Sequence, residues 1–167
     1  LNGFKDIVRL TDGFDIQDAI QSAYSNYSIE DTCFIVRSNK RANQYNQQIR
    51  TRILDKESDL SVGDYLMVVK NNYFWLGDDS KAGFIANGDM VYIERVLKME
   101  ERFGLRFVNL QVRLVDYPDE PELEVKVMLD TLMTDAPALT KEQSKAFSEA
   151  VYGHYMTQTN TKQKIKE

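Results

Sequence analysis

The chain has 167 residues, enough for one domain or two small ones. Its 43% apolar and 28% charged residues are typical of a globular protein, and no apolar run approaches the roughly 20 residues of a membrane span. Cys33 is the only cysteine, which excludes an internal disulfide. Because we also find no secretory signal, we expect a reducing, cytoplasmic location and no membrane partner. The net charge of −5 argues against bulk binding to nucleic acid, so any such contact has to be local.

The N-terminal part predicts a short strand or a lead-in, and then a helix. Residues 4–10 have the character of such a strand or lead-in. A helix is expected over residues 15–27, where apolar residues recur every three or four positions. Asp12 or Asp15 could cap this helix by accepting a hydrogen bond from a free backbone N–H.

The next part repeats this order. Residues 33–36 form an apolar run typical of a strand that is buried on both faces. Ser38 or Asn39 could cap a following helix, whose apolar stripe has the helical spacing of three, four and four: Ala42, Tyr45, Ile49 and Ile53. The order strand, helix, strand, helix predicts a parallel α/β layer.

Positive charge gathers on this second helix. Residues 37–56, the basic segment, hold six cations and one acid, so the segment carries +5 and the rest of the chain −10. The cations are Arg37, Lys40, Arg41, Arg50, Arg52 and Lys56. A strand that leads into a helix start is where α/β folds bind phosphates, which favours a site for a nucleotide or a nucleic-acid backbone. From composition alone, a solvated basic helix face is the more common explanation.

The pattern changes near Ser58 from helical to alternating. We expect strands at residues 65–69, 90–97, 105–115 and 123–129, joined by a hairpin loop at 100–104 and a turn at 117–121. Asn87-Gly88-Asp89 is typical of a tight turn that leads into a strand. Four or five short strands with little helix indicate a small β-barrel.

Three adjacent aromatic residues interrupt this part of the chain: Tyr73, Phe74 and Trp75. In a loop they could stack on unpaired bases, a contact worth about 1–3 kcal/mol per base. The alternative, which we favour from the sequence, is that two of them plug the end of the barrel.

The last part predicts one more helix. Thr140 and Gln143 have the spacing of a capping box. Phe147, Val151 and Tyr155 share one face of a helix that we expect to reach about Met156. The polar residues after it are expected to form a loose tail.

Several kinds of chemistry are missing from the sequence. Gly83 to Gly88 have the glycine spacing of a phosphate-binding P-loop, but Asp89-Met90 stand where that loop needs Lys followed by Ser or Thr. One histidine (His154) and one cysteine cannot form a zinc cluster, and we expect His154 to be solvated or at a helix end. The acids of residues 116–124 crowd into one turn, which predicts a solvated acidic loop and no metal site.

Three stretches resemble one protein family. VRSNKRANQYNQQIR (residues 36–50) is similar to motif IV of superfamily I DNA helicases, and the spacing of Arg37, Asn39, Asn46 and Arg50 is similar to that of the RecD- and Dda-type branch. VGDYLMV (62–68) and FIANGD (84–89) are similar to later pieces of the same branch, and all three stand in the family's order.

The resemblance implies a piece of a helicase whose fold class is α/β plus β. Residues 1–57 would be part of the second RecA-like lobe, 58–135 an inserted SH3-like β-barrel, and 136–167 a helix and polar tail that lead toward a missing motif V. The parent protein would use ATP and Mg²⁺ to move along single-stranded DNA, while this piece alone would hold no cofactor. Its partners would be single-stranded DNA and the rest of the helicase chain. Relatives are often labelled the alpha subunit of an exodeoxyribonuclease.

The resemblance also assigns roles to residues. Arg37 matches the motif IV arginine that reaches the nucleotide phosphates, and Asn39 would cap or orient that turn. Lys40, Arg41, Arg50 and Arg52 are candidates for contacts to nucleotide or DNA phosphates. The alternative is a non-enzymatic β-barrel module that binds single-stranded nucleic acid or a protein partner.

Overall fold

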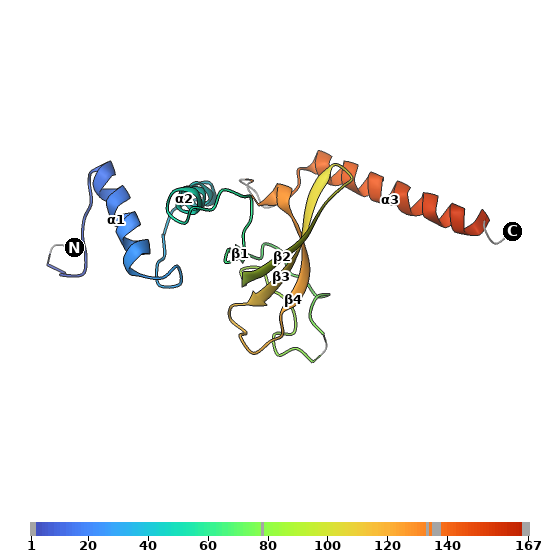
Figure 1. The fold of residues 1–167 in the computed structure, drawn as a ribbon. Coiled ribbons are helices and arrows are strands. Elements are labelled where there is room, and N and C mark those ends of the chain that lie inside the picture. Colours follow the sequence, from blue (N-terminus) through green and yellow to red (C-terminus); the bar gives the residue numbers. More distant parts are fainter. Residues whose placement is uncertain (1–2, 78, 133, 135–137, 165–167) are drawn as a thin grey trace. The chain divides into compact units, whose positions relative to one another are not determined.

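The computed structural model describes residues 3–77, 79–132, 134 and 138–164, with the backbone alone for residues 158–164. The chain divides into two compact units, Leu1–Glu57 (unit 1) and Ser58–Glu167 (unit 2), and the division falls where the sequence pattern changes. Its helices and strands are labelled in Figure 1. Within the described ranges, no helix combines the length and apolar character needed to cross a membrane.

Unit 1 contains the two helices predicted from its sequence. Helix α1 spans Gly13–Asn26, and the Asp12 side chain accepts a hydrogen bond of 2.7 Å from the backbone N–H of Phe14. Helix α2 spans Asn39–Arg52, and the Ser38 hydroxyl accepts one of 3.3 Å from the backbone N–H of Arg41. Of the candidate caps, Asp12 and Ser38 therefore do the capping, because each lies one residue outside its helix with an extended backbone.

The strand predicted at residues 33–36 is wrong, and of the two alternatives for residues 4–10, a short strand or a lead-in, the strand is not formed. Among the described residues, 33–36 make no backbone–backbone hydrogen bond. The Phe34 ring nevertheless stacks between Tyr24 of α1 and Tyr45 of α2, with centroids 6.1 and 6.0 Å away. The segment therefore has one face against the helices, but its backbone has no neighbouring strand in the described part of unit 1. The predicted parallel layer is therefore not formed by the described residues of unit 1.

Unit 2 is built on a four-stranded antiparallel meander, which the sequence predicted. The strands are β1 (Tyr65–Met67), β2 (Met90–Arg102), β3 (Leu105–Leu114) and β4 (Leu123–Met128), in that spatial order. Two register shifts in β2 mark bulges, which bend a strand and strengthen its twist. Strand β2 runs five residues past its predicted end at 97, because Phe103 and Gly104, with φ of 56° and 72°, make the tight turn to β3.

The core of unit 2 follows the predicted alternation. Side chains of Ile93, Val108, Leu110 and Val112 are fully buried on one face of β2 and β3. The other buried apolar residues of this core are Leu60, Ile85, Val91, Leu114 and Leu129. Leu129 belongs to a short 3-10 helix, η1 (Leu129–Thr131), directly after β4. The sheet therefore has a well-packed inner face.

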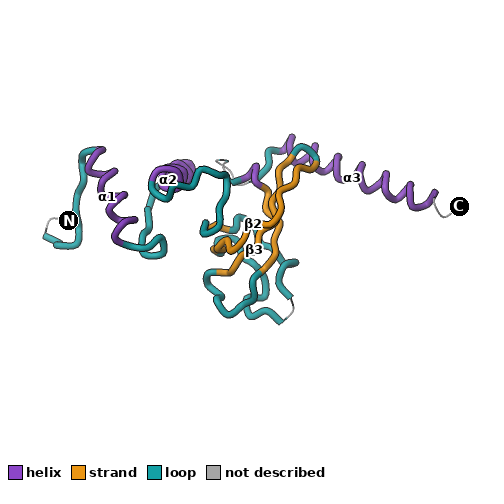
Figure 2. Tube along the Cα trace, in the orientation of Figure 1, coloured by secondary structure: helices purple, strands orange, loops and turns teal. Residues whose placement is uncertain are grey.

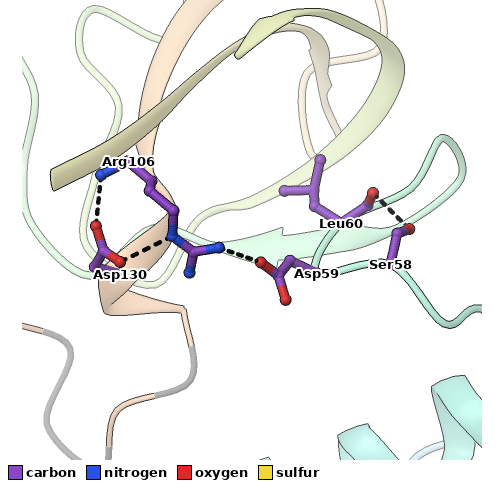
Figure 3. Close-up of polar contacts among 5 residues, drawn as sticks. All are labelled: Ser58, Asp59, Leu60, Arg106 and Asp130. Carbon is purple, nitrogen blue, oxygen red and sulfur yellow. Dashed lines mark hydrogen bonds and ion pairs between the residues drawn. The ribbon is translucent and has the colours of Figure 1, made fainter. Parts of the chain in front are cut away.

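An arginine ties three segments of unit 2 together (Figure 3). The backbone N–H of Arg106 donates to Asp130 Oδ2 at 2.6 Å, and its Nε donates to Asp130 Oδ1 at 3.1 Å. One terminal nitrogen of the same guanidinium donates to Asp59 Oδ2 at 2.8 Å. The start of β3 is thereby linked to η1 and to the chain that precedes β1.

Helix α3 (Lys141–Lys164) begins with the predicted capping box. The Thr140 N–H donates to Gln143 Oε1 at 3.0 Å, and the Gln143 N–H donates to Thr140 Oγ1 at 3.2 Å. Phe147 packs against the rings of Phe103 and Phe107 of the β2–β3 hairpin. The helix continues past Met156, so the loose tail predicted there is wrong for residues 157–164, which contain no glycine or proline to stop a helix.

Candidate phosphate and nucleic-acid interface

Arg37 lies at the junction between the extended segment 33–36 and the start of α2. Its side chain is exposed and makes no ion pair with the described residues. Ser38 caps the helix directly after it, so the backbone at this junction is held by a hydrogen bond. A fixed backbone and an exposed guanidinium are what a contact to an external phosphate requires.

The next residues of the predicted site share this end of the helix. Asn39, Lys40 and Arg41 form the first turn of α2, and all three are exposed. The backbone N–H of Arg41 is used by the Ser38 cap, while its side chain remains exposed. Lys40 takes part in an interaction within the chain. The helix dipole disfavours cations at a helix start by about 0.3–1 kcal/mol each. An anion bound here would offset this unfavourable electrostatic energy.

The structure separates the remaining two cations from this cluster. Arg50 and Arg52 lie in the last turn of α2. A helix rises about 1.5 Å per residue, so the two ends of this 14-residue helix are about 20 Å apart. The predicted basic site is therefore two sites: a cluster at the helix start, and a pair at the helix end, where cations are favoured by the dipole.

Arg52 borders a groove between α1 and α2 with a volume of about 200 Å³. The apolar part of its lining comes from the stripes of the two helices: Ile16, Ile20, Tyr45, Ile49 and Ile53. The spacing predicted these apolar stripes, but it did not predict that the two helices would leave a groove between them. The groove is mainly apolar and offers Arg52 as its cation.

The aromatic loop, residues 71–76, lies in the long connection between β1 and β2 that Figure 2 draws as loop. Tyr73, Phe74 and Trp75 are 62%, 90% and 42% exposed, so the expectation that two of them plug the barrel end is wrong. The side chains of Asn71 and Asn72, which were not predicted as site residues, accept hydrogen bonds from backbone N–H groups and hold the loop in this shape. Asparagine before a turn commonly accepts hydrogen bonds from the following backbone, and this signal could have been used.

Two further candidates from the sequence are the acidic turn at residues 116–124 and His154. Within the described ranges, no cluster of His, Cys, Asp and Glu could hold a metal. The acidic turn is solvated as predicted except at Glu120, whose Oε1 accepts hydrogen bonds from the Ser80 hydroxyl at 3.0 Å and the Lys81 backbone N–H at 2.6 Å. His154 is exposed, with its ring 5.7 Å from that of Phe103.

Comparison with known proteins gives no assignment: no protein-family model matches the chain, and no curated protein matches it either.

Proposed function

We propose that this chain is part of an ATP-dependent DNA helicase of the RecD and Dda type, to which it contributes Arg37 as a nucleotide-phosphate contact. The observation that carries the proposal is the position of Arg37: exposed, without an ion pair among the described residues, and directly before the capped start of α2. Lys40 and Arg41 in the next turn add positive charge at the same place.

The proposed architecture assigns residues 1–57 to the second RecA-like lobe, residues 58–135 to an inserted SH3-like barrel, and residues 136–167 to a connecting helix. The unit boundary at Ser58 and the four-stranded meander support the division between the first two of these parts. The unpaired segment 33–36 supports it as well, because a strand from the rest of the helicase chain would complete its hydrogen bonds. The parent protein would bind ATP, Mg²⁺ and single-stranded DNA.

The chemistry assigned to Arg37 is electrostatic. In phosphoryl transfer, charge spreads over the oxygens of the transferred group, and a guanidinium that contacts them stabilises the transition state. Arginines in this role account for about 10³–10⁵ in rate. The chain itself lacks the P-loop lysine and hydroxyl, so the nucleotide would be held mainly by the other lobe, with Arg37 supplied from this one.

The test is Arg37→Ala in the parent protein. We expect ATP turnover with saturating DNA to fall by about a hundredfold or more, because the transition-state charge loses its partner. DNA affinity without nucleotide, measured by fluorescence anisotropy, should change little. Arg37→Lys should rescue poorly, because a point charge does not reproduce the planar fork. Arg95→Ala, at an exposed position of β2, is the matched control and should keep both activities.

A second candidate is a non-enzymatic β-barrel module that binds single-stranded nucleic acid or a protein partner. The well-packed core of unit 2 and its exposed aromatic loop favour it. The same assay separates the two candidates, because the non-enzymatic module predicts no DNA-dependent ATP turnover in the wild-type parent protein. If Arg37→Ala weakens DNA binding and leaves ATP turnover intact, Arg37 contacts a DNA backbone and its assignment to motif IV fails.

A further inference from the structure

The aromatic loop presents three consecutive rings to solvent. Phe74 is 90% exposed, and Tyr73 and Trp75 on either side are 62% and 42% exposed. The Asn72 side-chain oxygen accepts hydrogen bonds from the backbone N–H groups of Phe74 and Trp75, at 2.9 and 3.1 Å. The backbone of Asn72 also pairs with that of the buried Ile85 in both directions, at 2.8 and 3.0 Å. A ligand therefore meets an ordered surface, so little conformational entropy is lost on binding.

The acidic turn is held against the same connection, residues 68–89, that contains the aromatic loop. The first residues of β2 pair with the last residues of β3, so the β1–β2 and β3–β4 connections leave the sheet at the same end. The Glu120 side chain joins these connections, because its Oε1 accepts hydrogen bonds from the Ser80 hydroxyl at 3.0 Å and from the backbone N–H of Lys81 at 2.6 Å. Carboxylates and aromatic rings therefore share one end of unit 2.

The acidic turn and the aromatic loop lie within reach of one short ligand. The backbone N–H of Ala82 donates to Glu120 Oε1 at 3.4 Å. Phe84, two residues after Ala82, has its ring centroid 5.0 Å from that of Tyr73. Two residues of backbone span at most about 7 Å. A single extended segment of about six residues, which reaches about 20 Å, can therefore contact both the rings and the acidic turn.

The negative charge of unit 2 is concentrated at this end. Residues 68–89 and the acidic turn together hold eight acids and two cations, a net charge of −6, whereas the rest of unit 2 carries +1. The exposed carboxylates include those of Asp79, Asp116, Asp119 and Glu122. Asp119 pairs with Lys81 at 3.9 Å, with side chains 86% and 79% exposed, and the other three make no ion pair with the described residues. An ion pair this exposed contributes little, so a cation from outside can replace it.

We propose that the aromatic loop and the acidic turn form a docking surface for a cationic peptide segment, rich in Lys and Arg, of a protein partner. A cation over the face of an exposed ring is attracted by the π-electrons of that ring. The long stems of Lys and Arg side chains also cover apolar surface such as that of Phe74. Further cations of the segment pair with the exposed carboxylates. The negative charge attracts such a segment and repels a polyanion.

Charge complementarity selects this partner. Aromatic rings alone also suit a neutral proline-rich peptide, but such a peptide makes no use of the carboxylates beside them. The docking surface depends only on residues 68–89 and 116–124, all of which belong to unit 2. It therefore goes beyond the functions proposed above and does not depend on Arg37 or on a nucleotide.

The chain carries its own probe, because Trp75 is the only tryptophan. The 167-residue chain is titrated with a peptide of about ten alternating Arg and Ser residues, long enough to span both loops, while Trp75 fluorescence is recorded. We expect a saturable change with this peptide, and none with a peptide of equal length in which Gln replaces Arg. The affinity for the Arg peptide should fall as the salt concentration is raised, because salt screens the exposed charges.

Two double variants separate the local charge from the overall charge. Asp119→Asn combined with Glu122→Gln should weaken binding of the Arg peptide roughly 2- to 30-fold, as the loss of two exposed ion pairs predicts. Glu101→Gln combined with Glu142→Gln is the matched control. It removes the same number of charges at exposed positions of β2 and α3 and should leave the affinity unchanged.

Two variants of Phe74 test the contribution of the ring. Phe74→Leu keeps an apolar side chain without a ring and should weaken binding of the Arg peptide roughly 2- to 5-fold. Phe74→Tyr keeps the ring and should bind as the wild type does. Because all the substituted side chains are exposed, the circular dichroism spectrum should stay unaltered, which checks the fold.

The proposal is overturned by equal binding of the Gln peptide, or by wild-type affinity of either Phe74→Leu or the double variant of Asp119 and Glu122. It is also overturned by a response to a proline-rich peptide or to a thymidine oligonucleotide with none to the Arg peptide. The helicase assignment fails in a different way. Its failure appears as an absence of DNA-dependent ATP turnover in the parent protein, which leaves binding of the Arg peptide in place.

Discussion

The two units of this chain form their elements in similar ways but differ in how much apolar surface they cover. The described part of unit 2 buries nine apolar residues in one core between its strands, its loops and η1. In the described part of unit 1, Ile49 alone is buried, while Val8, Phe14 and Ile35 are 76%, 82% and 96% exposed. Helix caps and apolar stripes are therefore sufficient to form α1 and α2, but they do not provide a core.

The difference has an energetic consequence. Full burial of one large apolar side chain contributes about 1.5–3 kcal/mol, and most such side chains of unit 1 do not receive this contribution. We therefore expect the stability of the isolated chain to reside in unit 2. Unit 1 would gain its core from the further polypeptide proposed above, which would cover Ile35 and pair with residues 33–36.

The largest effect is expected from two matched isoleucines. Ile93→Ala removes a fully buried side chain from the core of unit 2 and should lower the free energy of unfolding by about 2–5 kcal/mol. Ile35→Ala makes the same chemical change in unit 1 at a side chain that is 96% exposed, and it should change stability by less than about 0.5 kcal/mol. Urea unfolding monitored by circular dichroism measures both. If the two substitutions destabilise the chain equally, the contrast between the units is wrong.

A smaller, pH-dependent effect is expected at Asp130. The backbone N–H of Arg106, together with its guanidinium, holds the pKa of the Asp130 carboxyl below its usual value. A lowered pKa in the folded state stabilises the fold above the unfolded value of about 4, and this stabilisation is lost as the pH falls through the folded pKa. Asp130→Asn should therefore destabilise unit 2 at pH 7, less than Ile93→Ala does, and should approach the wild type in acid.

The control for this prediction is Asp116→Asn, an exposed carboxylate just after β3. Its urea midpoint should follow that of the wild type across the same pH range. A constant difference between Asp130→Asn and the wild type from pH 7 into acid would show that the carboxylate charge plays no part in the Arg106 network.

Local signals in the sequence predicted much of the fold. Asp12, Ser38 and the Thr140 capping box each mark a helix start that the structure confirms, because a cap acts within three residues. The alternation in 105–115 placed Val108, Leu110 and Val112 on one face of β3, and they are buried there. An apolar pattern with a period of two or 3.6 residues can be recognised within one stretch of the sequence, without knowing which other segments that stretch packs against.

Non-local contacts account for the errors. The apolar run 33–36 has the character of a strand, but a strand requires a neighbour, and the run itself does not specify one. Arg106 donates hydrogen bonds to two acids that are 47 and 24 residues away in the sequence. Glu120 accepts a hydrogen bond from the backbone of a loop residue that lies 39 residues before it. In the candidate site, the basic segment predicted one patch, whereas the length of α2 separates Arg37 from Arg52.

Amide hydrogen exchange of residues 33–36 tests the central claim most directly, namely that unit 1 is an incomplete layer that carries Arg37 at its edge. In the isolated chain we expect the amides of Phe34 and Ile35 to exchange almost as fast as an unfolded segment, because they have no backbone partner among the described residues, while those of Val108 to Val112 in β3 exchange slowest. In the parent protein, the amides of 33–36 should become as protected as those of β3. Protection of 33–36 in the isolated chain, or continued fast exchange in the parent protein, would contradict the account.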